Sequence, residues 1–397
     1  MITENTEPRM NPDNNARIYL DYAATTPLDE RVLEAMLPFF RQDFGNPSSI
    51  HRWGQTAENA LVHARELVSE SLMCSPGEII FTGSATESNN LILRGAAFAA
   101  RRQHGANHIL TSPVDHPSVT HTAQQLGIDF DFDIEFLAID SDGMVDLDDL
   151  KNKIRNDTII VSTIYANNEI GTINHISEVG AVCKSNGVLF HTDAVQAANY
   201  LTLDVDALNV DFLTLGGHKI YGPKGVSAMY MRSGTTVDSM ITGGGQEFGH
   251  RASTENIPLI VGFSEALRIA VSLQDELSRK HSRLRDGLID HVLASIPDSG
   301  ITGHRTLRLP NHASFFFDKI QSNALLAALD LAGFACSSGS ACKVGTSEPS
   351  EILLKLGLSE ASSLGSLRVT MGRYTNEDEI SALSAMLPTI IARLRPA

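Results

Sequence analysis

The stretch Leu215-Gly-Gly-His-Lys-Ile-Tyr-Gly-Pro-Lys-Gly225 places Lys219 just after a strand-like run, and an Asp-x-x-Gln pair, Asp193 and Gln196, stands a little upstream. A cofactor that reacts through an aldehyde needs an amine that bonds it as a Schiff base and a carboxylate that keeps a pyridine nitrogen protonated. Taken alone, the stretch is better explained as a surface lysine in a glycine-rich turn. The motifs that accompany it make the cofactor site the stronger interpretation.

Size and charge bound the class of protein. The chain has 397 residues, of which 42% are hydrophobic, which is enough for a large core and for two or more domains. Its 31 basic and 47 acidic residues give a net charge of −16. This charge would repel a phosphate backbone or an anionic lipid surface, so we expect neither nucleic acid nor a membrane as a partner.

The chain has no apolar run long enough to span a bilayer, and residues 1–16 form a polar tail without the hydrophobic core of a signal peptide. Its cysteines, Cys74, Cys183, Cys336 and Cys342, show neither metal-type nor disulfide-type spacing. We therefore expect no bound metal, reduced thiols and a cytoplasmic location.

The order of apolar runs predicts an α/β fold. Between Glu78 and Tyr230, short apolar runs alternate with helical patterns, which is typical of a mostly parallel sheet with helices on both faces. After Thr254 the pattern changes to one long helix over 259–294, followed by a smaller α+β arrangement. We expect three parts: a flexible tail over 1–16, a large domain over 17–258 whose first residues pack on the small domain, and a small domain over 259–397.

Three segments offer groups for a ligand. Phe81–Ser88 joins a strand to a helix whose free N–H groups would bind an anion, although a plain helix cap is the commoner meaning. His116 follows a strand, where an imidazole can stack on a ring or move protons, or can simply fill a turn. Asn168 follows a buried strand, at the sheet edge where α/β proteins bind ligands, but its amide suits a tight turn equally well.

Three further residues have both a functional and a plain explanation. Asp193 ends a buried strand, so it needs a donor such as a protonated pyridine, unless it is a helix N-cap. Arg368 lies on a strand-like run, where a substrate carboxylate and a structural salt bridge are equally good partners. Cys342 ends a run of small residues that suits a moving thiol; the alternative is a buried free cysteine. Cys336 lies nearby, which leaves a regulatory disulfide open.

Taken together, these segments resemble the cysteine desulfurases of the NifS/IscS type, which are class V aminotransferase-like enzymes of the fold-type I pyridoxal phosphate group. The resemblance runs from about Tyr19 to Tyr374. Any one motif is weak, but all of them in this order are highly specific. The motifs are Tyr19-Leu-Asp-Tyr-Ala-Ala-Thr-Thr-Pro27, Phe44-Gly-Asn-Pro-Ser48, Ala85-Thr-Glu-Ser88, Asn167-Asn-Glu-Ile-Gly171, His218-Lys-Ile-Tyr-Gly-Pro-Lys-Gly225 and Ser337-Ser-Gly-Ser-Ala-Cys342. The family fold implies a mostly parallel, seven-stranded sheet in the large domain.

The resemblance also implies a role for each matching position. Lys219 matches the Schiff-base lysine, Asp193 the partner of the pyridine nitrogen, and Cys342 the sulfur-accepting thiol. The remaining matches are His116 on the cofactor ring and in proton transfer, Gln196 and Asn168 near the cofactor phenolate, Asn168 also near the substrate, Ala85, Thr86 and His218 on the phosphate, Thr254 on the phosphate of the other subunit, and Arg368 on the substrate carboxylate. The match at Thr254 implies a homodimer.

Some positions depart from the family pattern. Gly216 stands where a serine hydroxyl is usual, and we expect Thr214, two residues back on the strand, to face the same way. Phe248 stands where arginine is usual, and the family's Arg-Ser-Gly-Thr reads Arg251-Ala-Ser-Thr254. These departures affect the phosphate site and the dimer loop, and they leave the lysine, the aspartate and the cysteine in place.

The activity implied by the resemblance is the conversion of L-cysteine to L-alanine, which leaves sulfur on Cys342 as a persulfide for an acceptor such as an iron–sulfur scaffold. The alternatives are a selenocysteine lyase, a class V aminotransferase, and a non-catalytic sulfur-relay or scaffold partner. Cys342 in its run of small residues favours the desulfurase. The intact Lys219 and Asp193 favour an enzyme over a non-catalytic partner.

Overall fold

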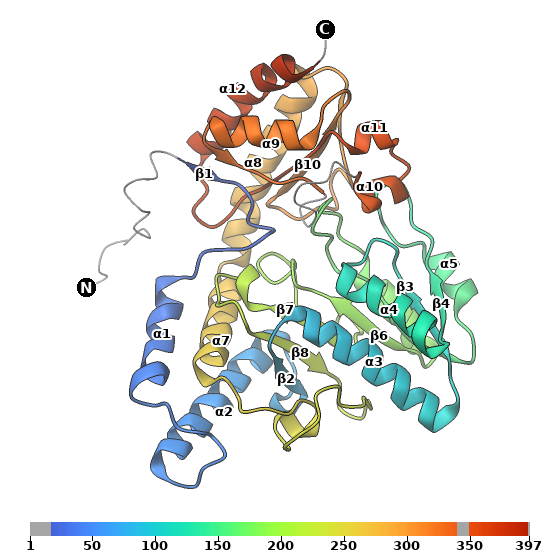
Figure 1. Cartoon of the computed structure of the whole chain (residues 1–397), viewed down its shortest axis with the longest axis vertical. Coiled ribbons are helices and arrows are strands. Elements are labelled where there is room, and N and C mark those ends of the chain that lie inside the picture. The colour runs from blue at the N-terminus through green and yellow to red at the C-terminus, as the bar shows by residue number, and fades with distance from the viewer. Residues whose placement is uncertain (1–16, 340–348, 396–397) are drawn as a thin grey trace.

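The computed structural model describes residues 17–339 and 349–395, arranged as a large α/β part and a smaller part above it (Figure 1). Cys342 lies outside the described residues, as does the tail over 1–16.

The large part is built on a seven-stranded sheet in the order β2-β8-β7-β6-β5-β3-β4. Its strands are β2 (Ile79–Thr82), β3 (His108–Thr111), β4 (Asp133–Phe136), β5 (Thr158–Ser162), β6 (Leu189–Asp193), β7 (Phe212–Gly216) and β8 (Ser227–Met231). All neighbours pair in parallel except β8, which is antiparallel to both β2 and β7. The predicted mostly parallel sheet is therefore confirmed.

Helices cover both faces of this sheet because side chains alternate along each strand. Ile79 and Phe81 of β2 pack in one apolar cluster with α1, α2, α6 and α7, whereas Ile80 packs in another with α3 and α4. The helices of this part are α1 (Glu30–Arg41), α2 (Arg52–Leu72), α3 (Ala85–His104), α4 (Pro117–Phe130), α5 (Leu147–Lys153), α6 (Ile176–Ser185) and α7 (Ile257–Ser272). Every residue of β5 is buried because helices cover both faces of the sheet, so the strand is mostly apolar and does not alternate with polar residues.

The single long helix predicted over 259–294 is instead two helices. α7 ends at Ser272, and α8 (Gln274–Ser295) continues at an angle of 65°. Apolar residues of α7 belong to the core of the large part, whereas those of α8 belong to a separate core. Burial against two different surfaces bends the chain at Leu273, although the helical periodicity is nearly continuous. The domain boundary at 258 stays a prediction, and this packing favours a boundary at Leu273.

The small part has an antiparallel sheet in the order β12-β10-β9, covered by α8, α9 and α12. Its further elements are β9 (Ser299–Ile301), β10 (His312–Phe317), α9 (Ser322–Leu331), β11 (Phe334–Ala335), α10 (Glu351–Lys355), α11 (Glu360–Ser363), β12 (Ser366–Thr370) and α12 (Glu377–Leu394). The first strand, β1 (Ile18–Tyr19), pairs in parallel with β11, and Leu20 lies in the core of the small part. The N-terminal end of the described chain thus packs on the small part.

Among the described residues, no single helix is long and apolar enough to cross a membrane. Helices α7 and α8 reach the length and apolar content of a membrane span only when the two are counted together, and they are bent by 65° where they meet.

Candidate active site

Two neighbouring strands bring Lys219 and Asp193 to one edge of the sheet. Asp193 is the last residue of β6, and it pairs in register with Thr214 of the parallel strand β7. β7 ends at Gly216, and a single 3₁₀ turn, Gly217–Lys219, follows at once. Because parallel strands end at the same edge, the amine and the carboxylate that the sequence placed 26 positions apart (219 − 193) belong to one site.

The amine of Lys219 lies against the N-terminal segment of the chain. Its Nζ donates to the backbone oxygens of Ala23 at 2.6 Å and Ala24 at 2.7 Å. Gln196 Nε2 donates to the same Ala23 oxygen at 2.9 Å, so Lys219 and Gln196 lie side by side. These two acceptors are neutral backbone carbonyls, which hold the amine against the N-terminal segment.

A chain of hydrogen bonds joins Asp193 to His116. Asn89 Nδ2 donates to Asp193 Oδ2 at 2.8 Å and to Ser118 Oγ at 2.8 Å, and Ser118 Oγ lies 2.8 Å from His116 Nδ1. Asn89 is fully buried and Asp193 is nearly so. Neither Asn89 nor Ser118 was predicted from the sequence. The one pattern that connects Asn89 with the site is its position four residues after Ala85, on the same face of α3.

His116 is held close to both charged groups. It caps α4, where its Nδ1 accepts from Ser118 N at 3.2 Å. Burial lowers the pKa of His116; the carboxylate of Asp193 opposes this shift, and the charge of Lys219 adds to it. The imidazole is therefore neutral at neutral pH, the form in which a ring can stack on a cofactor or accept a proton.

The start of α3 supplies free backbone donors next to this group. Ala85 and Thr86 are its first two residues, and Ser84 caps the helix by accepting from Glu87 N at 3.1 Å. A side chain at Gly216 would lie 3.7 Å from Ala85 Cβ, which places the end of β7 beside the helix start. A helix N-terminus with unsatisfied N–H groups favours an anion.

The structure shows the surroundings of His218 and Thr214, the two other residues considered for this anion site. His218 Nδ1 lies 3.1 Å from Thr25 Oγ1, and burial lowers the pKa of His218 to about 4, so its ring is neutral. Thr214 is on the same strand as Gly216, but its hydroxyl is fully buried and lies 3.1 Å from His191 Nε2. The threonine hydroxyl thus has a partner inside the sheet.

Arg368 reaches the site from β12 of the small part. Its guanidinium donates to Asp21 Oδ1 at 2.7 Å and to the backbone oxygen of Asn168 at 2.9 Å. The side chain is 4% exposed, and Arg368 Nε has no hydrogen-bond partner among the described residues. Asp21 is the structural partner that the sequence left open, and the unsatisfied Nε is a donor that a ligand anion can use.

The described structure does not place two of the predicted residues in this site. Thr254 is exposed, in the segment before α7, where it faces solvent. Cys342 falls in the stretch that the structure does not describe, three positions after Gly339.

The comparisons with known proteins agree with this geometry. Residues 18–383 match the family model described as aminotransferase class-V. The chain is 42% identical over 383 residues to a cysteine desulfurase IscS of Clostridium botulinum, covering 96% of each chain. It is 41% identical over 395 residues to a cysteine desulfurase IscS of Methanosarcina thermophila, covering 100% of this chain and 97% of that one.

Solved structures give the same answer. A NifS-like protein superposes with a TM-score of 0.88 at 34% identity, covering 95% of this chain and 100% of the other. A structure titled SspA in complex with cysteine superposes with a TM-score of 0.79 at 34% identity, covering 90% and 99%. The chain therefore belongs to the class V aminotransferase family of pyridoxal phosphate enzymes and, within it, to the cysteine desulfurases of the NifS/IscS type.

Proposed function

We propose that this protein binds pyridoxal 5′-phosphate and converts L-cysteine to L-alanine, with the sulfur left on Cys342 as a persulfide. The observation that carries the proposal is the meeting of Lys219, Asp193 and His116 at one sheet edge, beside the free start of α3. The family membership and the two relatives named cysteine desulfurase support the same activity.

The residues present fit pyridoxal phosphate. The donors at Ala85 and Thr86 suit the phosphate, Asp193 suits a protonated pyridine nitrogen, and the Lys219 amine suits the aldehyde. Asn89 Oδ1 is buried without a hydrogen-bond partner among the described residues, so the site holds polar capacity that the protein alone leaves unused. When bound, the cofactor supplies an electron sink for a carbanion at the substrate Cα.

The side chains divide the chemistry between them. The free amine of Lys219 would be the base that removes the Cα proton. Asp193 would keep the pyridine nitrogen protonated, and His116 would move protons near the substrate. The thiolate of Cys342 attacks the substrate sulfur: an S–S bond forms, the Cβ–S bond breaks, and the electron pair stays on carbon, which takes up a proton to give alanine. Substrate and thiol together thus balance to alanine and a persulfide.

Arg368 and Asn168 are the proposed contacts for the substrate. The guanidinium already holds Asp21, so an incoming carboxylate shares the arginine with that aspartate and uses its unsatisfied Nε. The persulfide sulfur then passes to an acceptor protein, such as an iron–sulfur scaffold. We place this chemistry in the cytoplasm, because a transfer thiol must stay reduced between turnovers.

Incubation of the purified protein with L-cysteine tests the proposal. We expect one alanine for each sulfur transferred, a peptide containing Cys342 that is heavier by one sulfur atom, and an absorbance band that sodium borohydride moves. Mass spectrometry of the peptides and amino-acid analysis measure these outcomes. A colourless protein that binds no cofactor would contradict the proposal, and formation of a keto acid in place of alanine would point to an aminotransferase.

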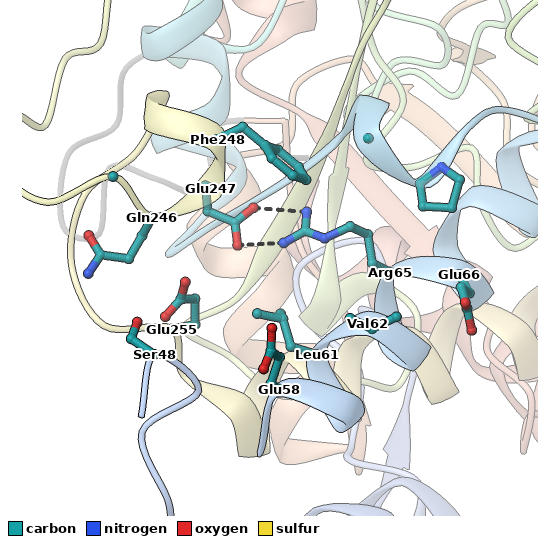
Figure 2. A pocket seen from close by; sticks show the side chains of 13 residues that line it. Ser48, Glu58, Leu61, Val62, Arg65, Glu66, Gln246, Glu247, Phe248 and Glu255 are labelled. Carbon is teal, nitrogen blue, oxygen red and sulfur yellow. Dashed lines mark hydrogen bonds and ion pairs between the residues drawn. The ribbon is translucent and has the colours of Figure 1, made fainter. Parts of the chain in front are cut away.

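A homodimer is part of the proposal, and exposed apolar side chains support it. Ile50 and Trp53, before and at the start of α2, are 93% and 58% exposed, and Phe248 is 59% exposed. Ser48 and Phe248 line one cavity of about 560 Å³, which contains none of the predicted site residues (Figure 2). Large apolar side chains exposed to this extent are typical of a protein interface.

The backbone at Phe248 is held in an unusual conformation. Glu247 and Phe248 both have positive φ, 46° and 55°, which costs free energy for residues other than glycine. Arg65 fixes this turn: it donates to Glu247 Oε1 at 2.8 Å, and its guanidinium carbon lies 4.9 Å from the centre of the Phe248 ring (Figure 2). The pair compensates for the strain and presents the ring that replaces the family's arginine to a second subunit.

The dimer gives a prediction at Ile50. Ile50→Asp should raise the dissociation constant of the dimer by about 100-fold, because it places a charge at the centre of an apolar contact. Sedimentation equilibrium measures the constant. Leu331→Asp is the matched control, since Leu331 is 89% exposed on α9 of the small part and should leave the dimer intact. A monomeric wild-type protein, or equal effects of both variants, would refute the interface.

A further inference from the structure

We propose that Glu169 is a positioning residue that holds together Gly339 and Ser350, the two places where the chain enters and leaves the segment that carries Cys342. The inference rests on the role proposed for Cys342. Glu169 lies in the loop after β5 of the large part, whereas Gly339 and Ser350 belong to the small part. The contact therefore joins the two parts.

The loop that carries Glu169 is fixed before it meets this segment. Asn167 Oδ1 accepts from Glu169 N at 2.8 Å and from Ile170 N at 3.0 Å. Asn167 Nδ2 donates to the backbone oxygen of Val114 at 2.8 Å, two residues before His116. A buried amide that satisfies three backbone groups leaves the loop one conformation, and the carboxylate therefore starts from a rigid base.

A single carboxylate oxygen binds Ser350 at one end of the segment and lies beside Gly339 at the other. Ser350 Oγ donates to Glu169 Oε2 at 2.8 Å. A Cβ at Gly339 would lie 2.9 Å from the same Oε2 and 3.2 Å from Ser350 Cβ. Gly339 is therefore glycine because the carboxylate and the serine occupy the space of a side chain, and the φ of Gly339 is not positive.

The neighbouring contacts align the two ends with the site. Ser337 exchanges backbone hydrogen bonds with Arg368, at 3.2 Å and 2.7 Å, so the chain entering the segment is bound to the strand of that arginine. On the leaving side, Ile352 and Leu353 of α10 pack against Ile170, next to Glu169. The polar contact of Glu169 and the apolar contact of Ile170 thus fix α10 to the same loop.

The electrostatic surroundings of Glu169 fit a carboxyl group whose role is to make close contacts, since they disfavour its charged form. Burial raises the pKa of Glu169 to about 7, and the negative charge of Glu351 adds to this effect. The hydroxyl of Ser350 and the charge of Arg368 oppose it. A carboxylate that served only through its charge would be exposed to water, whereas Glu169 is buried against Ser350 and Gly339.

This clamp has a consequence for the thiol. Cys342 follows Gly339 by three residues, so the position of Gly339 limits the volume in which the sulfur can be found. Without the clamp, Gly339 and Ser350 lose the carboxylate that they share, so we expect the transfer of sulfur to Cys342 to slow.

Trypsin offers a readout that needs no turnover, because Lys343 is the one basic residue between Lys319 and Lys355 in the sequence. With the cofactor-loaded protein, Glu169→Ala should raise the rate of cleavage after Lys343 by about tenfold, the factor that the loss of an ordinary hydrogen bond gives. Glu169→Gln keeps an acceptor for Ser350 and should stay near the wild-type rate. Glu360→Ala, which removes an exposed acid from α11, is the matched control and should change nothing.

A double-mutant cycle isolates the contact. Gly339→Ala should also speed cleavage, because its methyl displaces the carboxylate, but it should add little in the Glu169→Ala background, where that space is open. For sulfide release, Glu169→Ala should lower kcat more than it raises KM for L-cysteine. Wild-type cleavage in Glu169→Ala and Gly339→Ala, or additive effects of the two, would overturn the inference. Failure of the wild-type protein to form a persulfide would refute the function instead, and the cleavage rates would still stand.

Discussion

Lys219→Ala should lower the rate at which L-cysteine gives alanine by at least about 10⁴-fold. The amine has two tasks in the proposed mechanism, to bond the aldehyde and to take the Cα proton, and no second lysine side chain contacts the Ala23 and Ala24 oxygens in the described chain. Both tasks are lost together, so the effect exceeds that of removing an ordinary contact. Steady-state alanine production and the absorbance of the bound cofactor measure the result.

Two further variants separate chemistry from charge. Lys219→Arg keeps the positive charge but not a nucleophilic amine, and it should be as inactive as Lys219→Ala. Lys224→Ala removes an exposed lysine from the same loop and should keep the rate within about threefold of the wild type, as surface substitutions usually do. An active Lys219→Ala protein would remove this residue from the mechanism.

Cys342→Ser should abolish sulfide release, with a loss of at least about 10³-fold, while the cofactor remains bound. A hydroxyl is far less nucleophilic than a thiolate and forms no persulfide, so the reaction stops before the substrate sulfur is transferred. The absorbance of the protein should match that of the wild type, because Cys342 is not among the residues proposed to hold the cofactor. Sulfide released in the presence of a thiol reductant is the measurement.

Cys336→Ser is the matched control for this change. Burial raises the pKa of the Cys336 thiol, which also packs against the core of the small part, so its sulfur is protonated and unreactive. This variant should release sulfide within a few-fold of the wild-type rate. Equal losses in both variants would show that the effect comes from disturbed packing and not from the transfer thiol.

Local patterns in the sequence predicted most of the large part of the fold. Strands such as β5 and helices such as α6 satisfy only local periodicity and burial, which a sequence displays directly. The bend at Leu273 was missed because the apolar period runs through it, and only the choice between two cores breaks the helix. Packing of this kind depends on distant residues and leaves no local signal.

Some residues of the candidate site could be predicted from local sequence, whereas others depend on contacts between distant elements. Lys219, Asp193 and His116 carry ionisable groups in recognisable runs, and the structure brings them to one edge. Asn89 and Ser118 have no unusual local context, and their importance arises only when α3 and α4 lie side by side. Thr214 was expected to face the same way as Gly216, but side-chain direction alone does not predict the partner of a buried hydroxyl, here His191.

The segment over residues 18–24 contacts residues that lie 196 to 347 positions later in the sequence. Ile18 pairs with Phe334, Asp21 binds Arg368, and the Ala23 oxygen receives Lys219. These residues therefore remain without their partners until Phe334 and Arg368 have been synthesised. The complete site should form only in a late step of folding, because its contacts join residues with such a large sequence separation.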